Sequence, residues 1–365
     1  MSPSPQESTA ERRRALILGK NAAVPRHTRI AAILLMVVAT CAGAGGAPLP
    51  RFLRGVTVSC QTWGIEWQTP EMASTLDELR SLGANSFAIH PYARISDDGQ
   101  VRFRATGDNR HITAPLDWAH ERGMAAMVIP HIAYWGSKFS WRGEIRFDTD
   151  EQWDRFFSGY ETWIVEMARI AEAHHAPLFC VGLEYTHAQK FTERWLQIIA
   201  AVRSVYFGKL TYGANWNEYR EVQFWDALDY VGLLAYFPLT TASNPSPEQI
   251  AEGWGKRCRE LERFSRRNGD KQIVFVEVGY NENARAAAEP WSFDSGGDHA
   301  REIQERCIEA ALALSPESGG EHARHPWLAG MFFWKWFPDL PMHEEEDFRL
   351  QTPTIKALLA KHWKP

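Results

Sequence analysis

Eight short apolar runs recur along the chain from residue 55 onward, and a longer stretch with a polar face separates each run from the next. The runs cover residues 55–60, 84–90, 125–130, 178–184, 209–215, 230–236, 272–277 and 328–334. Most of them are nearly continuous in apolar residues, which is typical of parallel strands that are buried on both faces. The pattern therefore predicts eight parallel strands.

The stretches between the runs have the spacing of amphipathic helices. We expect helices at residues 70–82, 150–174, 191–206, 247–267, 299–314 and 354–362. Eight strands that alternate with helices over roughly 310 residues predict an α/β fold, the (β/α)8 TIM barrel. A doubly wound sheet is the structural alternative, but residues 59–64 lack the glycine-rich first turn that is typical of it.

Four long irregular segments each follow a predicted strand, at residues 91–112, 134–148, 280–298 and 337–351. In a barrel these segments form the loops at the C-terminal face, where active sites are built. We therefore expect the functional residues at the strand ends and in these loops.

The composition narrows the class of partner. The chain of 365 residues has a formal net charge of −5, so it has no basic surplus to neutralise the phosphates of a nucleic acid. It contains 16 Trp, 10 Tyr and 19 Phe, and such side chains either fill a core or stack on sugar rings. A carbohydrate partner is compatible with this composition and a nucleic acid is not expected.

The N-terminus has the order of an export signal. Basic residues from Arg12 to Arg29 precede an apolar stretch at 30–42, and small residues follow at 41–47. An uncleaved membrane anchor and lipidation at Cys41 are the alternatives. We predict a leader at residues 1–50, a catalytic domain at 51–365, and a periplasmic or extracellular location with membrane contact only through the N-terminal segment.

The five cysteines match no zinc-binding spacing and no CxxC motif. Cys60 and Cys180 lie in predicted strands, where buried free thiols are expected. Cys258 and Cys307 lie on predicted helices, and the sequence leaves open whether they form a disulfide.

Two glutamates stand at the ends of apolar runs that hold no other charge. Glu184 ends the run LFCVGLE, and Glu277 ends IVFVE. Burial of an unpaired carboxylate is costly, so such a residue is expected to face a site. In a closed barrel the ends of the fourth and seventh strands open at the same mouth, which predicts a catalytic pair of carboxylates.

Other polar and aromatic residues collect at the predicted strand ends. The candidate substrate-binding residues are Trp63, His90, Tyr92, His131, Asn215, Trp216, Tyr236, Tyr280 and Trp334. Amides and imidazoles bind hydroxyl groups, and indoles stack on the apolar faces of pyranose rings. We also expect Tyr236 or Tyr280 to donate a hydrogen bond to Glu277.

Motifs of other enzyme classes are missing from the sequence. It contains no HExxH, no GxxxxGK[ST] and no GxSxG. We therefore expect no metal site and no cofactor.

Four segments together resemble clan A glycoside hydrolases, and within that clan family 113, which is known for β-mannanases. They are GVTVSCQTWG at 55–64, VGLE at 181–184, VFVEVGY at 274–280 and GMFFWKW at 330–336. The resemblance covers roughly residues 54–361. It implies that Glu184 is the acid/base, that Glu277 is the nucleophile and that Trp334 lies under the sugar at the cleavage site.

One position departs from the clan pattern. Many clan A enzymes have Asn immediately before the acid/base, where it binds the sugar 2-hydroxyl, and this chain has Leu183. The departure affects the expected sugar more than the expected reaction.

The sequence thus predicts a monomeric, retaining β-glycoside hydrolase acting on a β-linked polysaccharide or oligosaccharide, β-1,4-mannan by resemblance. A retaining enzyme requires the two carboxyl groups to lie about 5–5.5 Å apart. The alternatives are a carbohydrate-binding barrel without activity and a structural protein of the cell envelope. The identity of the sugar and endo or exo action stay open.

Overall fold

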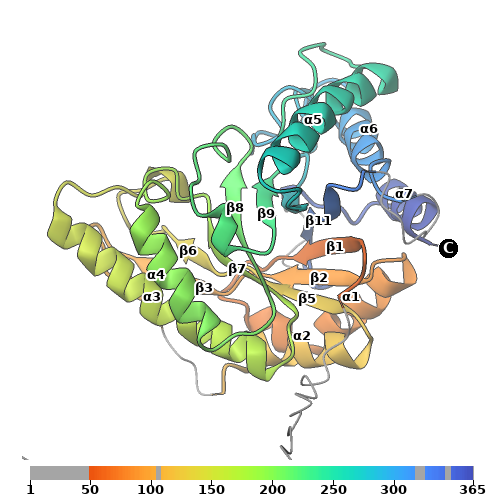
Figure 1. Ribbon diagram of the computed structural model, residues 1–365. Helices are drawn as coiled ribbons and strands as arrows, with labels where there is room; N and C mark the ends of the chain where they lie inside the picture. Colours follow the sequence, from red (N-terminus) through yellow and green to blue (C-terminus); the bar gives the residue numbers. More distant parts are fainter. Residues whose placement is uncertain (1–48, 104–107, 317–324, 342–346, 365) are drawn as a thin grey trace, which may run out of the picture. The chain divides into compact units, whose positions relative to one another are not determined.

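The computed structural model describes residues 49–364 apart from 104–107, 317–324 and 342–346. Its centre is a closed barrel with the strand order β1-β11-β10-β9-β8-β7-β5-β2, and all neighbouring strands are parallel (Figure 1). The strands are β1 (Leu53–Val58), β2 (Ser86–Ile89), β5 (Ala125–Val128), β7 (Leu178–Leu183), β8 (Lys209–Asn215), β9 (Val231–Leu234), β10 (Ile273–Val278) and β11 (Leu328–Trp336). Each overlaps one predicted run, so the predicted TIM barrel is confirmed.

Helices cover the outside of the barrel (Figure 1). They are α1 (Pro70–Ser81), α2 (Arg110–Glu121), α3 (Asp150–Ala173), α4 (Thr192–Arg203), α5 (Pro247–Arg267), α6 (Ala300–Leu312) and α7 (Pro353–Trp363). Two of the predicted helices begin with a capping box. The box consists of Thr149 and Gln152 at α3, and of Ser246 and Gln249 at α5.

Alternate residues of the strands pack in two separate hydrophobic cores, one between the barrel and its helices and one inside the barrel. In β10, Ile273 and Phe275 pack with the surrounding helices, whereas Val274 and Val276 pack inside the barrel. Gly213 of β8 leaves room for a neighbouring side chain, because a Cβ atom there would come within 2.4 Å of Leu183 Cδ1. A barrel of this size is filled by its own side chains, so a site can form only at its mouth.

The helix α2 and a small second sheet were not predicted. The left-handed residue Asn109 (φ 51°) precedes α2 without a side-chain cap, and Pro115 lies inside the helix, so the usual start signal is missing and a helix-breaking residue is present. The second sheet has the order β4-β3-β6 and consists of β4 (Val101–Arg102), β3 (Tyr92–Ile95) and β6 (His131–Ala133). It continues beyond β2 and β5 and pairs Tyr92 with His131.

The predicted export signal, its apolar stretch and Cys41 lie outside the described residues. No helix in the described part is long and apolar enough to cross a membrane. Cys258 and Cys307 do not form a disulfide; both are buried, as Cys60 and Cys180 are.

Candidate active site

A cavity of about 580 Å3 opens at the carboxyl ends of the barrel strands. Both strand-end glutamates line it, together with side chains from other strand ends and from loops. The lining residues are Tyr134, Ser140, Trp141, Arg142, Glu184, Asn215, Trp216, Asn217, Glu218, Tyr236, Glu277, Trp291, Phe293, Trp334 and Phe348. The cavity is therefore the candidate active site.

Glu184 follows directly after β7 and has a left-handed backbone, with φ 62°. Its N–H donates to the carbonyl of Gly213 at 2.9 Å, which holds the turn against β8. A non-glycine residue in this conformation is strained, and such strain is common at functional sites. The turn interrupts the strand at the residue whose carboxylate enters the cavity.

An arginine from a distant loop binds the Glu184 carboxylate. Arg142 lies in a short 3-10 helix, η2 (Arg142–Glu144), between β6 and α3. Its Nε donates to Glu184 Oε2 at 3.0 Å, and its Nη2 lies 2.8 Å from the same oxygen in an ion pair. The burial of Arg142 favours its neutral form, but the charges of Glu184 and Glu277 outweigh this and keep its pKa above the usual value.

Glu277 lies within β10 and is almost fully buried. The hydroxyl of Tyr236 donates to its Oε2 at 2.9 Å. Its Oε1 is 3.7 Å from His131 Nε2 and has no hydrogen-bond partner among the described residues. One carboxylate oxygen is thus held in place and the other is available to a ligand.

The two glutamates differ in their electrostatic environment. Burial, and next the charge of Glu184, raise the pKa of Glu277 to about 8, against the opposing effects of Arg142, Tyr236 and Lys335. Interacting carboxyl groups lose their protons as a pair. Burial and the mutual repulsion of the two carboxylates thus favour a state in which the pair keeps a proton.

Two stacked histidines form the wall next to Glu277. The rings of His90 and His131 are 4.7 Å apart, and the ring of Trp334 lies 5.3 Å from His90. Burial is the main cause that lowers the pKa of His90 to about 3 and also lowers that of His131. Both imidazoles are therefore neutral, which suits hydrogen bonding to hydroxyl groups.

Four of the nine predicted binding residues come together here. Asn215, Trp216, Tyr236 and Trp334 line the cavity with both glutamates. His131 lies behind the cavity wall, with its Nε2 3.7 Å from Glu277 Oε1. The remaining ones, His90, Tyr92 and Trp63, form a chain of ring contacts that leads outward from His131 to the surface residue Trp135.

The prediction that Tyr280 is a substrate-binding residue was wrong. Tyr280 is fully buried in the core between barrel and helices, and its carbonyl accepts a hydrogen bond from Gln304 of α6. It lies three positions after Glu277, so it faces the opposite side of the extended chain. Of the two expected donors to Glu277, only Tyr236 makes the bond.

Several lining residues were not among the predicted site residues. Trp141 and Arg142 come from the loop between β6 and α3, and Trp291 and Phe293 from the loop between β10 and α6. Trp291 stacks on Trp216, with ring centroids 5.4 Å apart and an interplanar angle of 13°. Both loops were recognised as irregular segments after strands, but their sequences carry no motif that singles out these residues.

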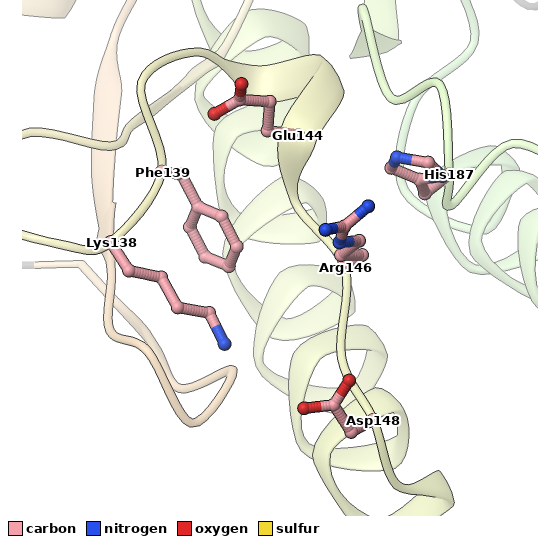
Figure 2. Close-up of a pocket in the computed structure, with 6 residues that line it drawn as sticks. All are labelled: Lys138, Phe139, Glu144, Arg146, Asp148 and His187. Atoms are coloured by element: carbon pink, nitrogen blue, oxygen red, sulfur yellow. The ribbon is translucent and has the colours of Figure 1, made fainter.

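A second hollow of about 360 Å3 involves the same loop, and Figure 2 shows its side chains. It is lined by Lys138, Phe139, Glu144, Arg146, Asp148 and His187. Its charges have both signs, and Lys138, Glu144, Arg146 and Asp148 are exposed. This charged hollow has a single aromatic ring in its lining, that of Phe139, and it lacks the buried carboxylates of the first cavity. Within the described ranges, no group of three or more His, Cys, Asp and Glu is placed to hold a metal ion.

Comparison with known proteins gives a consistent result. The sequence model of Glycoside Hydrolase Family 113 matches residues 56–350. The β-mannanase AaManA of this family from Alicyclobacillus acidocaldarius, solved in complex with ManMIm, is 25% identical, with a TM-score of 0.73 over 87% of this chain and 99% of that chain. No curated protein matches the chain.

Two further solved structures share the fold. A family 113 β-1,4-mannanase has a TM-score of 0.72 at 22% identity, over 86% of this chain and 100% of that chain. A family 5 mannosidase from Rhizomucor miehei, in complex with mannosyl-fructose, has a TM-score of 0.54 at 13% identity, over 86% of this chain and 92% of that chain.

Proposed function

The chain belongs to glycoside hydrolase family 113 and is a glycoside hydrolase, and we propose that it cleaves β-1,4-linked mannan or its oligosaccharides with retention of configuration. The observation that carries the proposal is the pairing of Glu184 and Glu277 in one aromatic cavity. The similar family 113 enzymes are β-mannanases, which supports this choice of substrate.

The reaction follows from the two carboxyl groups. Glu277 attacks the anomeric carbon through Oε1, while Tyr236 holds Oε2. Glu184 donates a proton to the glycosidic oxygen as the bond to it breaks, which leaves a glycosyl ester on Glu277. Glu184 then takes a proton from water, and the resulting hydroxide displaces Glu277 from the sugar.

The rest of the cavity binds the neutral sugar. Trp334 offers its indole to one face of the ring, and the neutral imidazole of His131 can hydrogen-bond a hydroxyl group. Leu183, which stands where many clan A enzymes have Asn, is buried in the barrel interior. The amide of Asn215 also lines the cavity, and we propose it as a contact to the sugar.

The substrate and mechanism are tested together on the purified protein. Manno-oligosaccharides, glucomannan, xylan and aryl β-glycosides form the panel, and NMR reports the anomer that appears first. We expect cleavage of the mannan substrates with the β-anomer first. Cleavage of another β-glycoside alone would overturn the mannan assignment, an α-anomer would overturn retention, and sugar binding without cleavage would indicate an inactive barrel.

We also propose that the protein is exported from the cytoplasm. A polymeric substrate is met outside the cytoplasm, and residues 1–47 have the order of a leader. We propose a mature monomer with the catalytic domain at residues 51–365, outside the cytoplasm. Mass spectrometry of the protein from its native host locates the new N-terminus or a lipid on Cys41, and light scattering gives the oligomeric state.

A further inference from the structure

Three aromatic side chains outside the cavity lining have no role in the reaction described above. Trp63 follows β1, Tyr92 begins β3 and Trp135 follows β6. Each ring contacts the other two, with centroids 5.7 Å apart for Trp63 and Tyr92, 5.8 Å for Trp63 and Trp135, and 5.2 Å for Tyr92 and Trp135. We call these three residues the aromatic triad. Segments that are separate in the sequence thus form one continuous aromatic surface.

Trp135 is the most exposed member of the triad, and 52% of it is accessible to solvent. Its ring contacts are tilted or edge-on, with interplanar angles of 81° to Trp63, 53° to Tyr92 and 54° to Tyr134. Among the described residues, no ring is therefore stacked parallel on its indole. Exposed apolar side chains that gather in one patch mark binding sites, whereas single ones need no explanation.

A tight turn holds Trp135 in this exposed position. The N–H of Ser137 donates to the carbonyl of Tyr134 at 3.0 Å, and the hydroxyl of Ser137 donates to the same oxygen at 2.6 Å. Gly136 has a φ of 85°, which fits the third position of a type II turn, so Trp135 occupies the second position. A surface that is formed before binding loses less conformational entropy when a ligand binds to it.

The triad is continuous with the catalytic cavity on the side of Glu277. Tyr134 lines the cavity, and its ring lies 6.1 Å from that of Trp135. The ring of Tyr92 lies 6.0 Å from that of His131, whose Nε2 is 3.7 Å from Glu277 Oε1. This oxygen attacks the anomeric carbon in the proposed mechanism. The sugar that becomes bonded to Glu277 is the glycone, so the triad lies on the glycone side of the bond to be cleaved.

The barrel order separates the triad from the stacked pair of Trp216 and Trp291. The triad residues follow β1, β2 and β5, directly or through the small sheet, and these three strands are consecutive neighbours in the closed barrel. Trp216 follows β8, and Trp291 lies between β10 and α6. The two aromatic surfaces thus lie on different arcs of the mouth, and a chain bound across the mouth can contact both.

Arg94 adds a hydrogen-bond donor to the aromatic surface. It is exposed, and its guanidinium carbon lies 4.6 Å from the centroid of the Trp63 ring. Aromatic faces stack on the apolar faces of pyranose rings, and guanidinium N–H groups donate to hydroxyl oxygens. A neutral polysaccharide offers both kinds of group, and the proposed substrate is such a chain.

We propose that the aromatic triad is a distal binding site for the β-linked polysaccharide. It holds sugar units on the glycone side, beyond the unit whose bond is cleaved. This inference rests on the proposed function. The cavity binds the sugars next to the reacting bond, and the triad extends the contact along the same chain.

Aryl β-glycosides of manno-oligosaccharides of increasing length test the distal site. The aryl group is the leaving group in this series, so every sugar unit lies on the glycone side. In Trp135→Ala we expect kcat/KM to fall about 5–10-fold on the longest members, through lost ring stacking, and to stay near the wild-type value on the aryl mannoside. Trp135→Tyr keeps a ring and should retain much of the wild-type response to length.

Two further variants show whether the effect belongs to the triad. Phe207→Ala removes an exposed ring at the opposite end of β8 and should leave the whole series unchanged. Trp291→Ala should respond to the length of free manno-oligosaccharides and not to the length of the aryl series. If Trp135→Ala lost the same factor on every member, or lost nothing on any, the distal site would be overturned.

A binding measurement tests the site without turnover. Glu277→Gln cannot form the glycosyl ester, and addition of Trp135→Ala to it should lower the affinity for mannohexaose about 5–10-fold in calorimetry. Unchanged affinity would contradict the proposal. Light scattering tests a different occupant, because a dimer that dissociates in Trp135→Ala would assign the triad to a second copy of the chain. If the proposed function fails, the wild type cleaves no member of the aryl series, and the binding measurement alone decides whether the triad holds the chain.

Discussion

At the scale of single residues, the site separates two chemically identical side chains by their surroundings. Glu277 is held through one oxygen by Tyr236 and keeps the other without a partner, as a nucleophile requires. Glu184 is half-buried at a strained turn and is ion-paired with Arg142. These differences support the assignment of the two roles.

The roles predict different responses to truncation. Glu277→Ala should abolish turnover of every substrate, because no glycosyl ester can form. Glu184→Ala should lose about 10²–10⁴-fold on substrates with poor leaving groups and much less on activated aryl glycosides, which need little protonation. Steady-state kinetics with and without azide make the test, and azide should partly restore the Glu184 variant alone. Asp148→Ala in the charged hollow is the control, and equal unrescued losses in both glutamate variants would contradict the assignment.

At the scale of elements, loops rather than strands decide the shape of the cavity. Trp216 follows β8, the neighbour of the strand that presents Glu184, and it stacks on Trp291 from the loop after β10. Trp291 is 43% exposed and lines the cavity. Because Trp216 lies next to the strand that presents Glu184, we expect the stacked pair to offer an aromatic face to the leaving-group sugar.

This platform predicts a dependence on chain length. Trp291→Ala should lower kcat/KM about 5–10-fold for long manno-oligosaccharides through lost ring stacking. Small aryl mannosides, which do not reach the platform, should be affected much less. Comparison of the two substrates in one variant checks the idea. Phe207→Ala is the matched control, because Phe207 is 78% exposed and precedes β8 at the opposite end of the strand; equal losses on both substrates would argue against a leaving-group platform.

At the scale of the whole molecule, the site lowers stability near neutral pH. The pKa of Glu277 is raised to about 8 in the folded protein, chiefly by burial, against about 4.3 in an unfolded chain. The folded state thus binds the proton more tightly. Its contribution to the free energy of unfolding is fully present below the unfolded pKa and is lost as pH rises through the folded one.

Glu277→Gln removes this penalty. We expect the variant to gain on the order of 2–4 kcal/mol in the free energy of unfolding near pH 8, and the gain to vanish near pH 4. Denaturant titrations at several pH values measure it. Glu252→Gln, which changes an exposed glutamate of α5, should show no such pH-dependent gain. A gain that is the same at every pH would contradict the electrostatic origin.

The sequence by itself determined the barrel and its two glutamates. Nearly continuous apolar runs can only be strands buried on both faces, and a lone carboxylate at the end of such a run must reach a site because its burial is costly. Both arguments use only residues that are close together in the sequence. The predicted strand ends consequently brought Asn215, Trp216, Tyr236 and Trp334 to the same cavity.

Only the tertiary structure decided what surrounds those glutamates. Arg142 precedes Glu184 by 42 positions and meets it only because the loop before α3 folds over the mouth. Tyr280 turns into the helix layer, and His90 stacks on His131 because a second small sheet continues two barrel strands. The direction of a side chain beyond a strand end depends on the conformation of the loop backbone and on contacts with segments far away in the sequence. The periodicity of apolar residues predicts neither of them.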